Sequence, residues 1–225
     1  MGVHQLEVLG DPDAVHRRGA ELIREKGRFA YNERSAFALA VSGGKDPWPR
    51  FSQLEDGDLP WAATEIFQVD ERVAPPGSDE RNLTHLIESL SIGAQGSIRP
   101  MPVTDDDLDA AADRYAASLP EAIDLAHLGI GPDGHTASLV PGDPVLEVTD
   151  KRVAVTAGEY QGARRMTLTY PELHRTRSLL WVVTGEEKVD ALRKLIAQDP
   201  STPSGRVQPG GESLILADRA AAPVA

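Results

Sequence analysis

Residues 36–44 read Ala36-Phe37-Ala38-Leu39-Ala40-Val41-Ser42-Gly43-Gly44, an unbroken apolar run followed by a hydroxyl side chain and two glycines. Such a continuous run is typical of a strand that is buried on both faces, as the strands of parallel sheets are. The two glycines let the backbone approach a ligand closely, and amide groups at such a turn can surround a phosphate. A plain turn from strand to helix fits the pattern equally well.

Further apolar runs recur along the chain, at residues 66–69, 98–103, 123–130, 152–156, 166–169, 179–183 and 214–216. Amphipathic stretches lie between them. We expect one helix capped by Thr104 or Asp105 and another over residues 186–198, and a long surface loop over 200–211. This alternation predicts a Rossmann-like α/β fold, with a mostly parallel sheet flanked by helices on both faces, in a single domain of residues 1–225.

The composition excludes several classes of function. The chain has no cysteine, which rules out disulfides, thiolate catalysis and cysteine-ligated zinc. Its net charge of -12 argues against a nucleic-acid partner. No apolar run approaches the roughly 18–20 residues that cross a bilayer, and residues 1–7 resemble no secretory signal. We therefore expect a cytoplasmic protein with no membrane partner, in which any anionic ligand needs a local basic pocket.

Charged residues follow the second apolar run at the place where ligands of open parallel sheets bind. Asp70-Glu71-Arg72 comes directly after Val69, so a side chain of this triplet is expected to point into a crevice. The similar segment 79–82 lies in the same loop. The sequence leaves open whether Arg72 or Arg81 faces the ligand.

The segment 128–139 combines a strand end, three glycines, an acid and a histidine. His135 follows Asp133 by two residues, with Gly134 between them to permit the bend. A carboxylate so placed can keep one imidazole nitrogen protonated while the other accepts a proton. We therefore predict that His135 is a general base, whereas the other five histidines have no comparable setting. Basic side chains later in the chain that could form an anion pocket are Arg164, Arg165, Lys188 and Arg206.

In these segments the chain resembles the 6-phosphogluconolactonases, within the wider glucosamine-phosphate isomerase/deaminase-like group. The resemblance covers essentially the whole chain in order. The segments that carry it are 42–44, 70–72, 129–142, 165–169, Thr184-Gly185 with Lys188, and 216–221. It implies a small lid or subsheet beside the main sheet. It also implies hydrolysis of 6-phospho-D-glucono-1,5-lactone to 6-phospho-D-gluconate, a step of the oxidative pentose phosphate pathway, without metal or cofactor.

The resemblance also implies residue roles. His135 would be the base, Asp133 would orient it, and Arg72 would stabilise the developing negative charge. The phosphate would be held by Ser42, Gly43, Gly44, Arg165, Lys188 and Arg206. Lys45-Asp46 stand where the family has a small residue and a threonine, which leaves a hydroxyl contact there open. The expected partner is a small sugar-phosphate lactone, and the protein is expected to be a monomer or weak homodimer.

Three other functions are weighed against this one. Amino-sugar-phosphate isomerases and deaminases resemble the chain at Gly-Asp-Gly-His, but they continue with phenylalanine, asparagine and a catalytic glutamate, where this chain has Ser138-Leu139-Val140. A non-catalytic sugar-phosphate-binding regulator is disfavoured because no basic helix-turn-helix precedes Leu6. A serine hydrolase is disfavoured because neither Ser42 nor Ser138 lies in a G-x-S-x-G elbow.

Overall fold

The structure is a computed structural model that describes residues 4–43, 54 and 57–223. Its main sheet has seven strands, all parallel, in the order β1-β10-β9-β6-β2-β3-β5. These strands are β1 (Gln5–Leu9), β2 (Phe37–Val41), β3 (Thr64–Gln68), β5 (Ile98–Arg99), β6 (Leu125–Leu128), β9 (Ser178–Val183) and β10 (Glu212–Asp218). The predicted Rossmann-like parallel sheet is confirmed.

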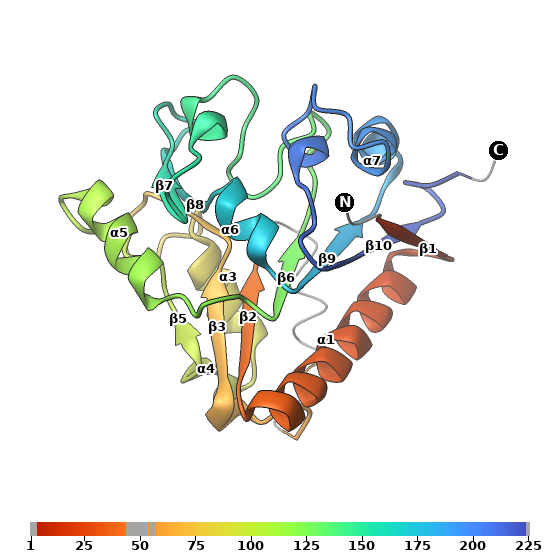
Figure 1. Cartoon of the computed structure of the whole chain (residues 1–225), viewed down its shortest axis with the longest axis horizontal. Coiled ribbons are helices and arrows are strands. Elements are labelled where there is room, and N and C mark those ends of the chain that lie inside the picture. Colours follow the sequence, from red (N-terminus) through yellow and green to blue (C-terminus); the bar gives the residue numbers. More distant parts are fainter. Residues whose placement is uncertain (1–3, 44–53, 55–56, 224–225) are drawn as a thin grey trace.

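Helices cover both faces of this sheet (Figure 1). One face carries α1 (Pro12–Arg34), α3 (Asn82–Ser89) and α4 (Ile92–Gln95), and the other carries α5 (Leu108–Ser118), α6 (Tyr170–Arg175) and α7 (Val189–Ile196). Strand β2 shows why its sequence is apolar throughout. Ala38 and Ala40 point into one core, and Phe37, Leu39 and Val41 point into the other.

A second sheet of three antiparallel strands lies beyond the carboxyl ends of the main sheet (Figure 1). It consists of β4 (Asp70–Arg72), β8 (Arg165–Leu168) and β7 (Val153–Val155), in that order. Val69 joins the two sheets, because its N–H donates to the Val41 carbonyl and its own carbonyl accepts from the Leu168 N–H, both at 2.8 Å. The subsheet implied by the resemblance is therefore present, and it places Asp70 and Arg72 above the strand ends.

Several sequence expectations need correction. The cap of α5 is Asp107, which accepts from the Ala110 N–H at 2.9 Å, rather than Thr104 or Asp105. The run 98–103 forms only a two-residue strand, since Pro100 and Pro102 have no N–H to donate. Residues 200–211 are not simply a surface loop. They include a short 3-10 helix whose buried Ser204 donates its N–H to the Gly134 carbonyl at 2.9 Å.

Helix α1 was not predicted, although its start carries a clear signal. Asp11 caps it by accepting from the Ala14 N–H at 2.8 Å, and Pro12 occupies the first turn. The predicted helix 186–198 is a 3-10 turn, Glu186–Lys188, followed by α7.

In the part of the chain that the structure describes, no helix has the length and apolar character to span a membrane.

Candidate active site

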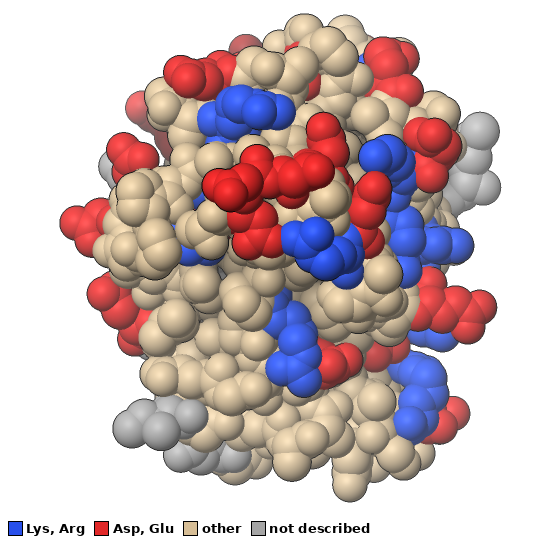
Figure 2. Space-filling view, turned by 90° about the vertical axis from the view of Figure 1, so that its left-hand side faces the viewer, with Lys and Arg blue, Asp and Glu red and all other residues tan. Residues whose placement is uncertain are grey.

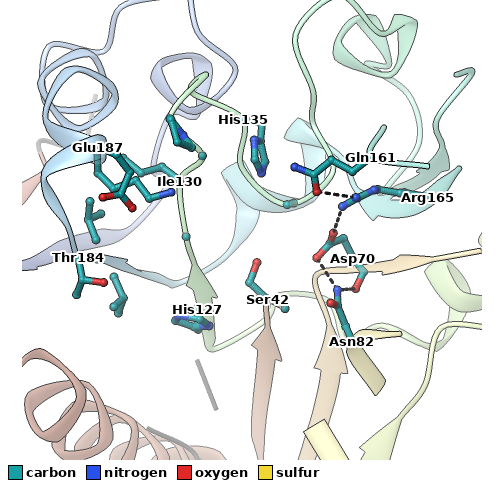
Figure 3. Close-up of a pocket in the computed structure, with 18 of the residues that line it drawn as sticks. Ser42, Asp70, Asn82, His127, Ile130, His135, Gln161, Arg165, Thr184 and Glu187 are labelled. Atoms are coloured by element: carbon teal, nitrogen blue, oxygen red, sulfur yellow. Dashed lines mark hydrogen bonds and ion pairs between the residues drawn. The ribbon is translucent and has the colours of Figure 1, made fainter. Parts of the chain in front are cut away.

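A cleft of about 410 Å³ opens at the carboxyl ends of β2, β6 and β9, beside the small sheet (Figure 3). Ser42 follows β2, Gly129 follows β6 and Thr184 follows β9, while Arg72 and Arg165 come from the small sheet. Ligands of open parallel sheets bind at this edge, so the main sheet and the subsheet together build the expected kind of site.

His135 and Asp133 form a hydrogen-bonded pair at this cleft. The distance from His135 Nδ1 to Asp133 Oδ1 is 2.6 Å, and Figure 3 shows the ring of His135 pointing into the space above Ser42. The loop is closed by hydrogen bonds from the Gly131 N–H to the His135 carbonyl at 2.8 Å and from the Gly134 N–H to the Gly131 carbonyl at 2.9 Å. Gly134 has a φ of +82°, which favours glycine there. The sequence spacing therefore brings the pair together.

The charge of Asp133 fixes which nitrogen of His135 is basic. Burial raises the pKa of Asp133, but hydrogen bonds and charge from His135, with a hydrogen bond from Tyr160, outweigh burial and hold this pKa below its usual value. Asp133 is thus an anion at neutral pH and only accepts hydrogen bonds. The proton at the contact therefore lies on Nδ1 of His135, and Nε2 of the neutral ring is free to accept a proton.

Positively charged side chains form another part of the lining. Arg72, Arg165 and Lys188 all line the cleft, and the buried guanidinium of Arg165 lies 4.0 Å from Asp70 Oδ2. Burial lowers the pKa of Arg165, the charge of Asp70 opposes this, and Arg72 adds to the lowering. An arginine remains charged under such shifts, so the cleft keeps a cation facing its ligand.

The structure distinguishes Arg72 from Arg81. Arg81 is buried and its Nε lies 3.5 Å from Glu71 Oε2, whereas Arg72 lines the cleft. The Glu71 carboxylate also accepts from the N–H groups of Arg72, Asn82 and Leu83, each at 2.8 Å. Arg81 thus belongs to the start of α3, and Arg72 is the arginine that can reach a ligand.

The turn after β2 packs closely on Asn82. A Cβ atom on Gly43 would lie 1.9 Å from Asn82 Oδ1, so a side chain at this position would displace Asn82. Asn82 in turn donates to the Asp70 carbonyl at 3.0 Å, and Asp70 Oδ2 accepts from Ser138 Oγ at 2.6 Å. Gly44, together with Lys45-Asp46, lies outside the described residues.

Arg206 is not among the residues that line the cleft, contrary to the sequence expectation. Its guanidinium donates to Glu147 Oε1 and to the Leu146 carbonyl, both at 3.0 Å, and lies 5.1 Å from the centre of the Tyr170 ring. These contacts occupy the guanidinium with Glu147, Leu146 and Tyr170. The lining of the cleft therefore gives no support for the expected contact between Arg206 and a phosphate.

Sequence reasoning missed several residues of the site. Asn82, Gln161 and Glu187 line the cleft, and Tyr160 contacts the Asp133–His135 pair. Gly162 after Gln161 signals a turn, but nothing in the sequence places that turn beside His135. Asn82 belongs to the segment 79–82 and Glu187 directly precedes Lys188, but only the basic residue beside each was considered as a ligand contact.

The cationic lining contrasts with the outer surface. Figure 2 shows acidic side chains gathered on the side of the molecule where α5 lies. In and just before α5, the exposed acids are Asp105, Asp106, Asp107, Asp109 and Asp113. Within residues 4–43, 54 and 57–223, no three His, Asp or Glu side chains are grouped so that they could hold a metal ion. Arg72, Arg165 and Lys188 supply local positive charge for an anionic ligand, beside the carboxylates of Asp70 and Glu187, in a molecule whose net charge is -12.

A family model described as glucosamine-6-phosphate isomerases/6-phosphogluconolactonase matches residues 10–216. The chain belongs to this family. Among relatives in the family, the 6-phosphogluconolactonase of Nostoc sp. is 34% identical over an alignment of 233 positions that covers 96% of each chain.

Solved structures of proteins from this family have the same fold. The crystal structure of the 6-phosphogluconolactonase from Thermotoga maritima is 27% identical, with a TM-score of 0.84, and the match covers 97% of this chain and 100% of that one. A monomeric glucosamine-6-phosphate deaminase shares the fold, with a TM-score of 0.84 at 18% identity over 97% of this chain and 98% of its own. The resemblance read from the sequence is confirmed, and the fold alone does not separate the two activities of the family.

Proposed function

We propose that this protein is a 6-phosphogluconolactonase, which hydrolyses 6-phospho-D-glucono-1,5-lactone to 6-phospho-D-gluconate. The relative from Nostoc sp. that bears this name is 34% identical over nearly the whole chain. The observation that carries the proposal is the 2.6 Å contact between Asp133 and His135 at a cleft that Arg72, Arg165 and Lys188 also line. A general base and an anion-binding wall then face the same small cavity.

The proposed reaction uses water directly. A δ-lactone is an activated ester, so neither a metal nor a covalent intermediate is required. Nε2 of His135 takes a proton from water while the water oxygen bonds to the lactone carbonyl carbon. The tetrahedral intermediate then collapses, the bond from this carbon to the ring oxygen breaks, and the imidazolium returns its proton to that oxygen. Asp133 stabilises the imidazolium in between.

The cations are assigned different tasks. Arg72 is proposed to stabilise the oxyanion that forms on the carbonyl oxygen. Arg165, Lys188 and the turn Ser42-Gly43-Gly44 are proposed to hold the phosphate at the other end of the substrate. Fixing that end aligns the carbonyl with the water near His135, and alignment of this kind lowers the barrier substantially.

The deaminase alternative lacks the glutamate that such enzymes carry in the loop after the histidine. Val140, a buried apolar residue, stands where such enzymes carry the glutamate, and the nearby Ser138 Oγ donates to Asp70 Oδ2. Glu147 does not line the cleft and pairs with Arg206 at 3.0 Å. The lactonase reaction needs no second acid–base residue of this kind, so the geometry favours it.

A coupled assay on freshly made 6-phosphoglucono-δ-lactone tests the proposal, with the spontaneous hydrolysis rate subtracted. We expect rapid turnover that survives dialysis against EDTA, and no ammonia from glucosamine 6-phosphate. Ammonia release without lactone hydrolysis would establish the deaminase. Tight binding of the sugar phosphate with neither reaction would establish a regulator.

A further inference from the structure

Tyr160 contacts the Asp133–His135 pair from a distant part of the chain. Its hydroxyl donates to Asp133 Oδ2 at 3.0 Å and lies 3.2 Å from His135 Nδ1. The two rings meet edge to face, with centroids 5.2 Å apart. Since His135 bonds Asp133 Oδ1, the tyrosine binds the carboxylate oxygen that the histidine leaves open.

The tyrosine is itself held firmly. Gln161 and Gly162 have φ values of +53° and +85°, as in a type I′ turn, and the Tyr160 N–H donates to the Ala163 carbonyl at 3.0 Å. Arg165 donates to the Tyr160 carbonyl at 3.0 Å, and its guanidinium lies 5.1 Å from the centre of the tyrosine ring. Backbone and ring are thus both fixed by neighbours, so the hydroxyl is aimed at Asp133.

The single hydroxyl proton matters for the state of the histidine. Burial raises the pKa of Tyr160, and the hydrogen bond and charge of Asp133 raise it further, so the phenol stays a neutral donor. If its proton went to Nδ1, the neutral ring would carry its own proton on Nε2 and could not accept one from water. Donation to Asp133 instead leaves Nδ1 protonated and Nε2 basic.

We propose that Tyr160 is a positioning residue for the hydrolysis, because it fixes the Asp133 carboxylate and thereby the orientation and tautomer of His135. This inference rests on the proposed function of the cleft. The charged and titratable groups in contact with Tyr160 are Asp133, His135 and Arg165. Tyr160 does not line the cleft, so it acts through Asp133 and His135.

The variant Tyr160→Phe keeps the ring and removes the hydroxyl. We expect kcat near pH 7 to fall about 10-fold with KM unchanged, which is less than the roughly 10²–10⁴-fold contribution of a general base because His135 itself is retained. The loss should be larger at pH 6 than at pH 8. Without the hydrogen bond from the Tyr160 hydroxyl, the charge of Asp133 stabilises the imidazolium of His135 more strongly. His135 then becomes available as a base only at higher pH. A purely structural role predicts the same loss at every pH.

Tyr170→Phe is the matched control. Tyr170 is a buried tyrosine that does not line the cleft, and its hydroxyl donates to the Pro203 carbonyl at 2.9 Å. This variant loses a comparable hydrogen bond and should keep the wild-type kcat and pH profile. An equal effect of both substitutions would overturn the proposal.

Nitrogen-15 NMR of histidine-labelled protein tests the inference without turnover. The His135 signals are assigned among the six histidines by their loss in His135→Gln. In the wild type we expect Nδ1 to be protonated and Nε2 unprotonated in the neutral ring. In Tyr160→Phe the ring should titrate about 0.5 pH unit higher. Unchanged titration in Tyr160→Phe overturns the inference. A wild type that hydrolyses no lactone would defeat the proposed function separately.

Discussion

Single residues in this cleft matter through the space they leave as well as through their side chains. Gly131 lies directly under the His135 ring, and a Cβ atom there would be 2.1 Å from both Cε1 and Nδ1 of that ring. It would also lie 2.6 Å from Asp133 Oδ1. The position of the proposed base therefore requires that residue 131 have no side chain.

The substitution Gly131→Ala tests this requirement. We expect the displaced ring to lower kcat roughly 100-fold, as small misplacements of catalytic groups do, while the protein stays folded. Steady-state kinetics and circular dichroism measure the two effects. Gly10→Ala is the control, since a Cβ atom on Gly10 meets no heavy atom within 4 Å. Wild-type kinetics in Gly131→Ala would show that the ring is not held against this backbone.

Residues close in sequence were predicted more easily than residues that meet through the fold. His135 and Asp133 are two positions apart, so their contact could be expected from the chain alone. Tyr160 is 25 residues from His135 in the sequence, and no local sequence pattern predicts its contact with the pair. Arg72 and Arg81 follow identical Asp-Glu pairs. In the fold, Arg81 is buried beside the Glu71 carboxylate at the start of α3, whereas Arg72 lines the cleft.

Among the elements, α5, α6 and β7 are joined by one arginine. Arg152 forms a two-pronged ion pair with Glu172, at 2.6 and 3.0 Å, and the Glu172 side chain is fully buried. The same guanidinium donates to the carbonyls of Ala116, Leu119 and Pro120, which lie at the end of α5 and just beyond it. Arg152 therefore provides donors both for carbonyl groups at the end of α5 and for the buried Glu172 carboxylate.

Replacing this arginine should weaken the whole fold. We expect Arg152→Ala to lower the free energy of unfolding by about 3–5 kcal/mol, because Glu172 is left buried without its partner. Lys151→Ala is the neighbouring control. Its ion pair with Asp113 at 3.2 Å is exposed, so its loss should cost about 0–1 kcal/mol. Urea unfolding of the two variants measures the difference, and equal values would contradict this account of Arg152.

The sequence predicts where most strands lie better than it predicts which strands pair with one another. Apolar runs identified strands at residues 37–41, 64–68, 125–128 and 178–183 because each is buried on both faces. The strands β7 and β8 are also largely buried, but they pair in the small sheet. A hydrophobic pattern indicates that a strand is buried, but it does not indicate which strand lies beside it. The expectation of a second, smaller sheet therefore came from the family resemblance and not from periodicity.

At the scale of the whole molecule, buried histidines link stability to pH. Burial lowers the pKa of His4 and of His174. Below the ordinary value near 6.5, the unfolded chain therefore binds more protons than the folded chain. The free energy of unfolding should fall as the pH drops below this value, and the loss is complete once the pH is below the folded-state pKa values.

His4→Gln tests this linkage. His4 Nδ1 lies 2.7 Å from Ser213 Oγ, and glutamine can keep a hydrogen bond there without titrating. Thermal or urea unfolding between pH 7.5 and 5.5 should show a shallower loss of stability in the variant than in the wild type. Parallel curves for the two proteins would mean that His4 does not contribute to the pH dependence.

The proposed function depends on one step, in which the neutral imidazole of His135 activates water beside a lactone that is held by its phosphate. The most direct measurement is the turnover of 6-phosphoglucono-δ-lactone by wild type and His135→Ala, with 6-phosphogluconate affinity measured on both by calorimetry. We predict that kcat falls roughly 10²–10⁴-fold while product affinity stays nearly unchanged. Full turnover by His135→Ala above the spontaneous background would contradict the account.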